Sequence, residues 1–148
     1  MGIFGFTSWM YGSDEIHYGN DGRGYVLAYA SEALTAKTPY ALIWGQYGLQ
    51  AEATADDTRS FIIGVPEDSF ASGTKGCKIY VKGIVEDVIT PSLSVTAGHA
   101  FGILNNVLTD VGAAYSGAAT EWGVCATTST TSTTQDIILT GHLITNAT

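Results

Sequence analysis

The chain has 148 residues, of which only 14% are charged, and its formal net charge is −8. The length corresponds to about one domain. The acidic balance argues against direct nucleic-acid binding, because neutralising phosphates requires Lys and Arg. No apolar run reaches the ~18 residues of a membrane helix. The N-terminus lacks the basic start and apolar core of a signal peptide, so we expect synthesis in a cytoplasm and no contact with a membrane.

Residues 1–23 are predicted to form an extended N-terminal arm. Five aromatic residues in this segment are interspersed with glycines. Such a segment cannot build a core of its own, so its aromatic side chains have to lie on the domain or on a neighbouring subunit. Because aromatic residues supply much of the energy of protein interfaces, they are candidate interface residues. They are Phe4, Phe6, Trp9, Tyr11 and Tyr18.

Residues 24–148 are predicted to form a β domain made of two repeats, at about 24–87 and 88–148. Three blocks recur in the same order along the chain. Residues 34–42 match 95–103, residues 63–65 match 122–124, and residues 78–85 match 136–143. Small insertions and deletions in loops produce the slight drift in spacing. A period this long indicates a duplicated supersecondary unit.

Strand signals follow one another along both repeats. Candidate strands cover 24–29, 40–44, 61–65, 78–85, 101–104, 122–126 and 136–143. The two longest alternate apolar and other residues with period two, which is typical of half-buried strands. Gly83 and Gly141 share one phase and indicate a bulge or bend. Many short, evenly spaced strands favour a barrel or a sandwich.

The connections are predicted from their polar and small residues. Residues 51–57 are expected to form a helical turn, and residues 105–112 a hairpin around Asn105-Asn106. The Thr- and Ser-rich run 127–134 is expected to be a solvated loop, and Asn20-Asp21-Gly22 a turn into the first strand of the domain.

No catalytic constellation is present in the sequence. No GxSxG motif surrounds a serine, and His17, His99 and His142 are isolated residues expected to be structural or surface histidines. Adjacent acid pairs such as Asp14-Glu15 and Glu67-Asp68 point to opposite faces of an extended strand and are expected to be solvated. Asp14-Glu15 with His17 could touch a cation, but further ligands are missing.

The two cysteines, Cys77 and Cys125, show no zinc spacing. We expect two buried, reduced thiols, with a disulfide as the alternative. The sequence therefore predicts no enzyme, no metal and no cofactor.

Residues 61–68, 72–85 and 92–98 resemble the small capsid decoration (cement) proteins of tailed bacteriophages. The shared pattern is a Gly-Val pair, a small-residue loop, a V-x-V-x-G-x-V-like run and an SLSVTAG segment. The resemblance covers roughly residues 24–104, and the internal repeat extends it to 148. It does not cover the arm, and this family has no catalytic residues to carry over.

The resemblance implies an all-β fold, a small β-barrel or β-tulip-like domain. It also implies a protein of the virion exterior, made in the host cytoplasm. Such a protein binds the major capsid protein on the outside of an icosahedral shell, often as a trimer, and stabilises contacts between capsomers.

Two other function classes stay open. The first is another virion component: a head fibre, a tail component or a small coat protein. The second is a carbohydrate-binding β module that uses Trp9, Trp44 or Trp122 as a stacking platform. Trp44 and Trp122 fall in apolar strand blocks, so we expect them to be core residues.

Overall fold

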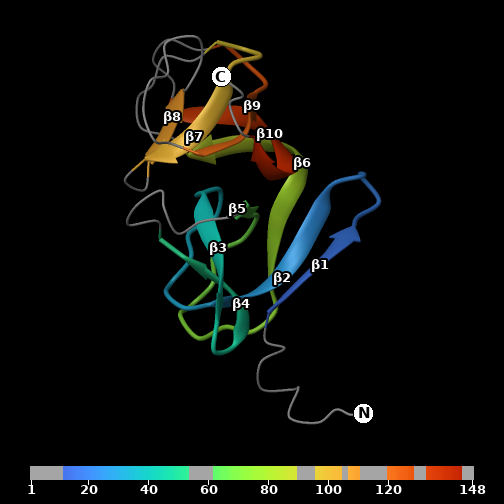
Figure 1. Ribbon diagram of the computed structural model, residues 1–148, viewed down its shortest axis with the longest axis vertical. Helices are drawn as coiled ribbons and strands as arrows, with labels where there is room; N and C mark the ends of the chain where they lie inside the picture. Colours follow the sequence, from blue (N-terminus) through green and yellow to red (C-terminus); the bar gives the residue numbers. More distant parts are fainter. Residues whose placement is uncertain are drawn as a thin grey trace.

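The computed structural model describes residues 12–53, 62–89, 96–104, 107–110, 120–128 and 133–144. These ranges contain ten strands and no helix, and therefore none that could span a membrane (Figure 1). The predicted all-β class is confirmed. The strands are β1 (Ser13–Tyr18), β2 (Gly24–Ala30), β3 (Tyr40–Gly45), β4 (Gly48–Glu52), β5 (Ile62–Pro66), β6 (Cys77–Ile89), β7 (Ala100–Leu104), β8 (Val107–Asp110), β9 (Thr120–Cys125) and β10 (Thr134–Ile144).

Five of the strands pair in a closed cycle. β2 pairs with β4, β4 with β3, β3 with β5, β5 with β6, and β6 returns to β2. The β2–β4 pair is parallel and the others are antiparallel. Two of the joints are short, since β2–β4 and β5–β6 each hold at only two residue pairs. The arrangement is thus partly ring-like rather than a continuous barrel.

One buried apolar cluster gathers residues from these strands. Each large aliphatic side chain taken fully out of water contributes roughly 1.5–3 kcal/mol. The cluster excludes charged groups, which is why the strands alternate buried and exposed positions, as in β2. Its members are Val26, Ala28, Ala30, Leu34, Tyr40, Leu42, Leu49, Ala51, Cys77, Ile79 and Val81.

Strand β6 is the longest element and links the two halves of the molecule (Figure 1). Residues 77–82 pair with β2, and residues 82–89 pair with β10. The strand bends at Gly83, whose φ of 97° is a backbone conformation that side chains rarely allow. The bend predicted at this glycine is confirmed.

The strand order shows the same pattern twice. One half of the sheet has the strand order β4-β3-β5-β6, and the other half, taken from its far edge, has the order β8-β7-β9-β10. The hairpin β3–β4 thus corresponds to β7–β8, β5 to β9, and β6 to β10. We call β2 to β5 with residues 77–82 the first unit, and residues 83–89 with β7 to β10 the second unit. The registers agree as well, so the two similar repeats are a property of the fold. Tyr40–Gly64 corresponds to Phe101–Gly123, and Val65–Tyr80 corresponds to Val124–Ile138.

The boundaries of the predicted parts stay predictions. Strand β6 runs without a break across residue 87, where the first repeat was expected to end. Within the predicted arm, β1 pairs with β2 at the edge of the sheet, while residues 1–11 lie outside the described residues.

A second buried cluster lies between the two units. It combines Val65 and Tyr80 of the first unit with Val85 and Ile137 of the second. One face of β5 and β6 in the first unit therefore packs against one face of β6 and β10 in the second. The complete set of buried members is Ala41, Ile63, Val65, Tyr80, Val85, Val88, Cys125, Ile137 and Leu139.

Two expectations were wrong. Ala51 and Glu52 belong to β4 and not to a helical turn, because their backbone is taken up in the ladder with β3; residues 54–57 lie outside the described residues. Trp44 is 51% exposed rather than a core residue. Burial falls along β3 towards its turn, so the last residues of this apolar block extend past the covered interior.

The remaining local predictions agree with the structure where it describes them. Leu104 pairs with Val107, which leaves the two-residue connection Asn105-Asn106 of a hairpin. In the Thr-rich run, Thr127, Thr128 and Thr133 lie outside strands, while Thr134 begins β10.

Candidate functional site

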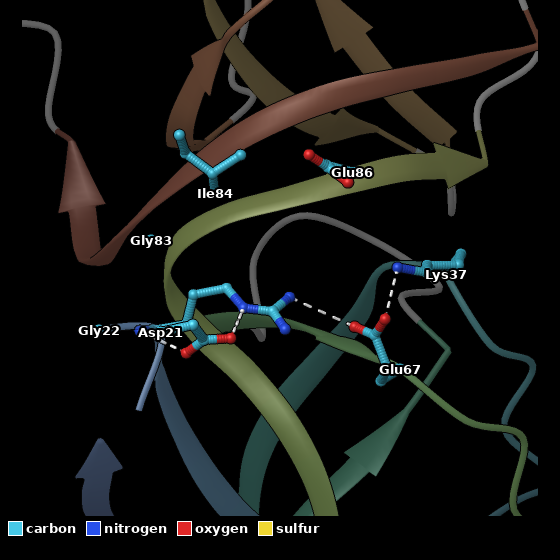
Figure 2. Close-up of a pocket in the computed structure, with 8 residues that line it drawn as sticks. Asp21, Gly22, Lys37, Glu67, Gly83, Ile84 and Glu86 are labelled. Atoms are coloured by element: carbon cyan, nitrogen blue, oxygen red, sulfur yellow. Dashed lines mark hydrogen bonds and ion pairs between the residues drawn. The ribbon is translucent and has the colours of Figure 1, made fainter. Parts of the chain in front are cut away.

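A cleft of about 440 Å³ opens where β6 bends away from β2 (Figure 2). Four parts of the chain form its walls: the turn before β2, the loop before β3, the end of β5 and the bend of β6. The cleft lies at the junction of the two units, so any group bound there would touch both. The lining residues are Asp21, Gly22, Arg23, Lys37, Glu67, Gly83, Ile84 and Glu86.

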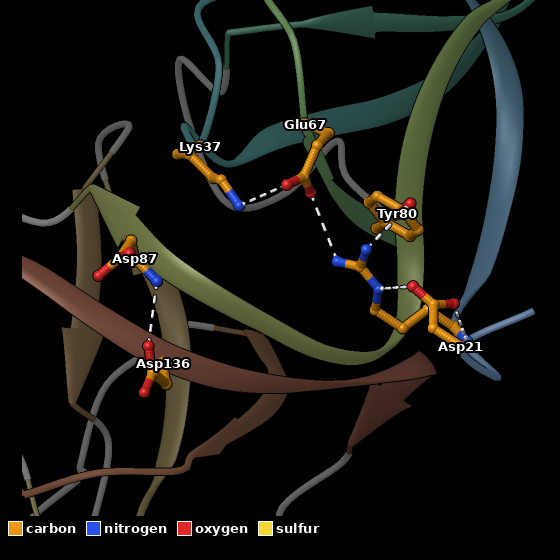
Figure 3. A network of polar contacts seen from close by, with 7 residues as sticks. Asp21, Lys37, Glu67, Tyr80, Asp87 and Asp136 are labelled. Carbon is orange, nitrogen blue, oxygen red and sulfur yellow. Dashed lines mark hydrogen bonds and ion pairs between the residues drawn. The ribbon is translucent and has the colours of Figure 1, made fainter. Parts of the chain in front are cut away.

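Arg23 is the centre of a polar network in this cleft. Figure 3 labels its partners Asp21, Glu67 and Tyr80. Its Nε lies 2.7 Å from Oδ2 of Asp21, and a second guanidinium nitrogen lies 3.4 Å from Oε2 of Glu67. The third nitrogen donates a hydrogen bond of 3.2 Å to the hydroxyl of Tyr80. Arg23 thus joins the start of β2 to β5 and β6.

Asp21 shapes the turn that presents Arg23. Its Oδ1 accepts a hydrogen bond of 3.0 Å from the backbone N–H of Arg23, a local bond that favours turns at Asp and Asn. This backbone bond, followed by the side-chain bond from Arg23, holds the pKa of the Asp21 carboxyl below its usual value. The turn predicted at Asn20-Asp21-Gly22 is confirmed.

Glu67 is shared between two cations. Its Oε1 lies 2.8 Å from Nζ of Lys37, and its Oε2 faces Arg23. The hydrogen bond from Lys37 lowers the pKa of Glu67, and partial burial opposes that shift. Lys37 is also held by its backbone, which donates to Pro66 O at 2.8 Å and accepts from Ile89 N at 2.7 Å.

The cleft contains no pair of groups set up for acid–base or nucleophilic chemistry. Asp21, Arg23, Glu67 and Lys37 alternate in sign and neutralise one another. Within the described part of the chain, Glu86 is the lining carboxylate that has no ion pair. These ion pairs form a structural clamp beside the cleft.

The described residues contain no group of three or more His, Cys, Asp or Glu side chains placed to hold a metal ion. His17 stacks on Tyr25 with ring centres 5.4 Å apart. Both cysteines are buried and reduced, and they belong to different apolar clusters, so the disulfide alternative does not apply.

Of the predicted interface residues, the structure describes one. Tyr18 ends β1 and is 59% exposed, and Nζ of Lys82 lies 5.8 Å from the centre of its ring. Phe4, Phe6, Trp9 and Tyr11 lie outside the described residues. Tyr18 does not line the cleft, so this predicted interface residue and the cleft are separate parts of the described surface.

This fold has a known counterpart. The N base of the head fibre protein gp8.5 of bacteriophage phi29 is similar to this chain, with a TM-score of 0.55 and 13% sequence identity. The similarity covers 82% of this chain and 98% of the phage protein chain. At this identity the match shows a shared fold. No protein-family model and no curated protein matches the chain.

Sequence reasoning did not find the cleft. Glu67 was assigned to a solvated acid pair, although it lies 44 residues from its partner Arg23 and meets it across the fold. The available signal was a single arginine placed directly after a turn in a chain with six basic residues. Such an arginine is expected to form an ion pair, but its position in the sequence does not indicate which carboxylate is its partner.

Proposed function

We propose that the protein is a structural protein of the outer surface of a tailed-phage head. The observation that carries this proposal is the fold similarity, which spans 98% of the head fibre base of phage phi29. Because a fold does not by itself imply a function, the resemblance of residues 24–104 to phage decoration proteins matters as a second line of support. Both lines of support favour a structural protein of a phage virion, and the outer surface of the head is our proposal for its place.

The described site supports a structural role. Its charged groups are used in ion pairs that tie the turn before β2 to β5 and β6. Such a clamp stiffens the junction of the two units, which is useful in a protein that bears load on a particle surface. Attachment as an oligomer, with a trimer as the predicted form, would multiply a modest single-site affinity.

Two head-surface roles are proposed, in order. The first is the base of a head fibre, which the similarity in fold favours. The second is a cement protein that binds the major capsid protein and stabilises contacts between capsomers, which the sequence pattern favours. The two roles differ in whether the bound protein stabilises the head.

The test uses heads of the phage that encodes this protein, purified from a strain in which its gene is deleted. The purified protein is added back, and bound copies per head are measured by sedimentation and protein mass. Binding that saturates, with DNA release on heating unchanged, supports the fibre base. Binding that raises the temperature of DNA release supports the cement role. Absence of binding contradicts both.

Trp44 gives the carbohydrate alternative one specific observation, because its side chain is 51% exposed. The nearby polar recess around Tyr47 and Gln50 has Trp44 outside its lining. Gln50 pairs with Ile43, and Trp44 pairs with Leu49, so the two lie on opposite faces of the hairpin. A glycan array compared between the wild type and Trp44→Ala tests the alternative, and equal, background-level signals would remove it.

A further inference from the structure

One face of the second unit, which reaches from the wall of the cleft at Ile84 to β9, carries a row of apolar side chains. Ile84 pairs with Ile138, and Ile138 pairs with Val124, so the three lie side by side across β6, β10 and β9. Ile84 is 51% exposed and Ile138 is 37% exposed, while Val124 is half-buried. Ile89, on the same face of β6, is 47% exposed.

The same row exists in the first unit, where it is covered. Its members are Val65, Tyr80 and Tyr25, which pair across β5, β6 and β2 in the same register. Val65 is fully buried, Tyr80 is 4% exposed, and Tyr25 packs against the same cluster. The second unit covers this row. The second unit therefore buries this row of the first unit, whereas the equivalent row of the second unit faces solvent.

The open face is not built like an ordinary solvent-facing sheet. An antiparallel sheet with one wet face alternates apolar residues inside with polar residues outside. Here residues of β6 and β10 are apolar on both faces at the centre, since Val85 and Ile137 fill the core while Ile84 and Ile138 point outward. Apolar groups gathered on a surface mark an interaction site.

We propose that this face is an interface between copies of this chain. Charge supports a second copy as the occupant. Lys82 and Glu86 flank Ile84 on β6, one on each side of the row, and both are exposed. A copy turned end over end would place Lys82 of one chain against Glu86 of the other, with the isoleucines between them. A face that matches itself in this way makes a two-fold contact, which joins copies in pairs. It is therefore a different contact from the one that would build the predicted trimer.

This inference does not depend on the role in a phage head, because it concerns the protein alone. The first experiment is light scattering of the purified full-length protein at about 10–100 µM. The wild type is expected at an even multiple of its 15.5 kDa monomer mass, because a two-fold contact joins copies in pairs. Ile84→Lys and Ile138→Lys are expected to weaken association at least about tenfold, because each buries an unpaired charge.

The matched control is Leu27→Lys. Leu27 is 37% exposed, as is Ile138, but it lies on β2 of the first unit, away from the open face. This variant is expected to keep the wild-type mass. Circular dichroism and the thermal midpoint of each variant show whether it is folded, so a mass change from unfolding is recognised.

A second pair of variants does not touch the core. Lys82→Glu and Glu86→Lys should each lower the associated fraction, and the double variant should restore it, because the contact is then complementary again. A wild type that is monomeric throughout overturns the proposal, whether or not it binds phage heads. So does an Ile138→Lys variant that is folded and keeps the wild-type mass, or a double reversal without recovery.

Discussion

The guanidinium carbon of Arg23 lies 4.0 Å from the centre of the Tyr80 ring, and this contact joins the start of β2 to the middle of β6. Tyr80 is 4% exposed and belongs to the cluster between the two units. A cation over an aromatic ring contributes about 0.5–2 kcal/mol, depending on how far it is removed from water. Arg23 also pairs with Asp21 and Glu67, so one side chain links the turn, the ring and the core.

Replacing Arg23 by lysine should lower the free energy of unfolding by about 1–2 kcal/mol, because a lysine lacks the planar group that stacks and forks towards several acceptors. Urea unfolding of the wild type and of Arg23→Lys measures this. Lys75→Met serves as a control, since it removes an exposed cation and should change the free energy of unfolding by less than about 0.5 kcal/mol. Equal stability of Arg23→Lys and the wild type would contradict the clamp.

The bend of β6 should depend on the glycine at position 83. Its φ is 97°, and a Cβ placed there would lie 3.1 Å from Cγ of Arg23. Gly83→Ala is therefore expected to cost more than the ~1–2 kcal/mol of left-handed backbone alone. Urea unfolding gives the value.

Gly22→Ala is the matched control for that substitution. Gly22 has a φ of 80° and no atom within 4 Å of an added Cβ, so it reports the backbone cost without crowding. A larger loss at position 83 than at position 22 supports the close packing of Arg23 under the bend. A smaller loss at position 83 would show that Arg23 moves aside.

Stability should fall in acid partly through Glu67. Its pKa is held below its ordinary value of 4.5, mainly by the hydrogen bond from Lys37. A carboxyl with a lowered pKa in the folded state contributes stability that is fully present above the unfolded value. That contribution disappears as the pH falls through the folded pKa. Urea midpoints measured from about pH 6 to pH 3 should therefore decline less steeply in Glu67→Gln than in the wild type.

Asp68→Asn is the control for the loss of one carboxylate next to Glu67. Asp68 is exposed and has no ion pair within the described residues. Its variant should keep the steepness of the wild type. If Glu67→Gln and Asp68→Asn give the same pH profile, the ion pair with Lys37 does not stabilise the fold.

The sequence was sufficient for most of the strands and for their recurrence, and insufficient for how the two repeats pack against each other. Period-two alternation located β6 and β10 because one face of each strand is buried. β4 was missed because it is short and its Gly, Gln and Glu residues carry no strand signal. Tyr80 is buried and the equivalent Ile138 is exposed because the second unit covers this face of the first unit. A contact between segments so far apart in the chain leaves no local sequence pattern. The ion pair between Glu67 and Arg23 also joins distant segments, so no local sequence pattern predicts it.

The two thiols provide a probe of the whole fold. Cys77 is fully buried and Cys125 is 3% exposed, and burial raises the pKa of the Cys77 thiol. Because the thiolate is the reactive form, a thiol reagent such as DTNB should label neither cysteine quickly in native buffer and both in urea. Slow labelling should accelerate in Gly83→Ala by the fold-change in the unfolding equilibrium, since exposure then requires unfolding. Rapid labelling of one thiol in the native protein would instead place it in a locally opening segment.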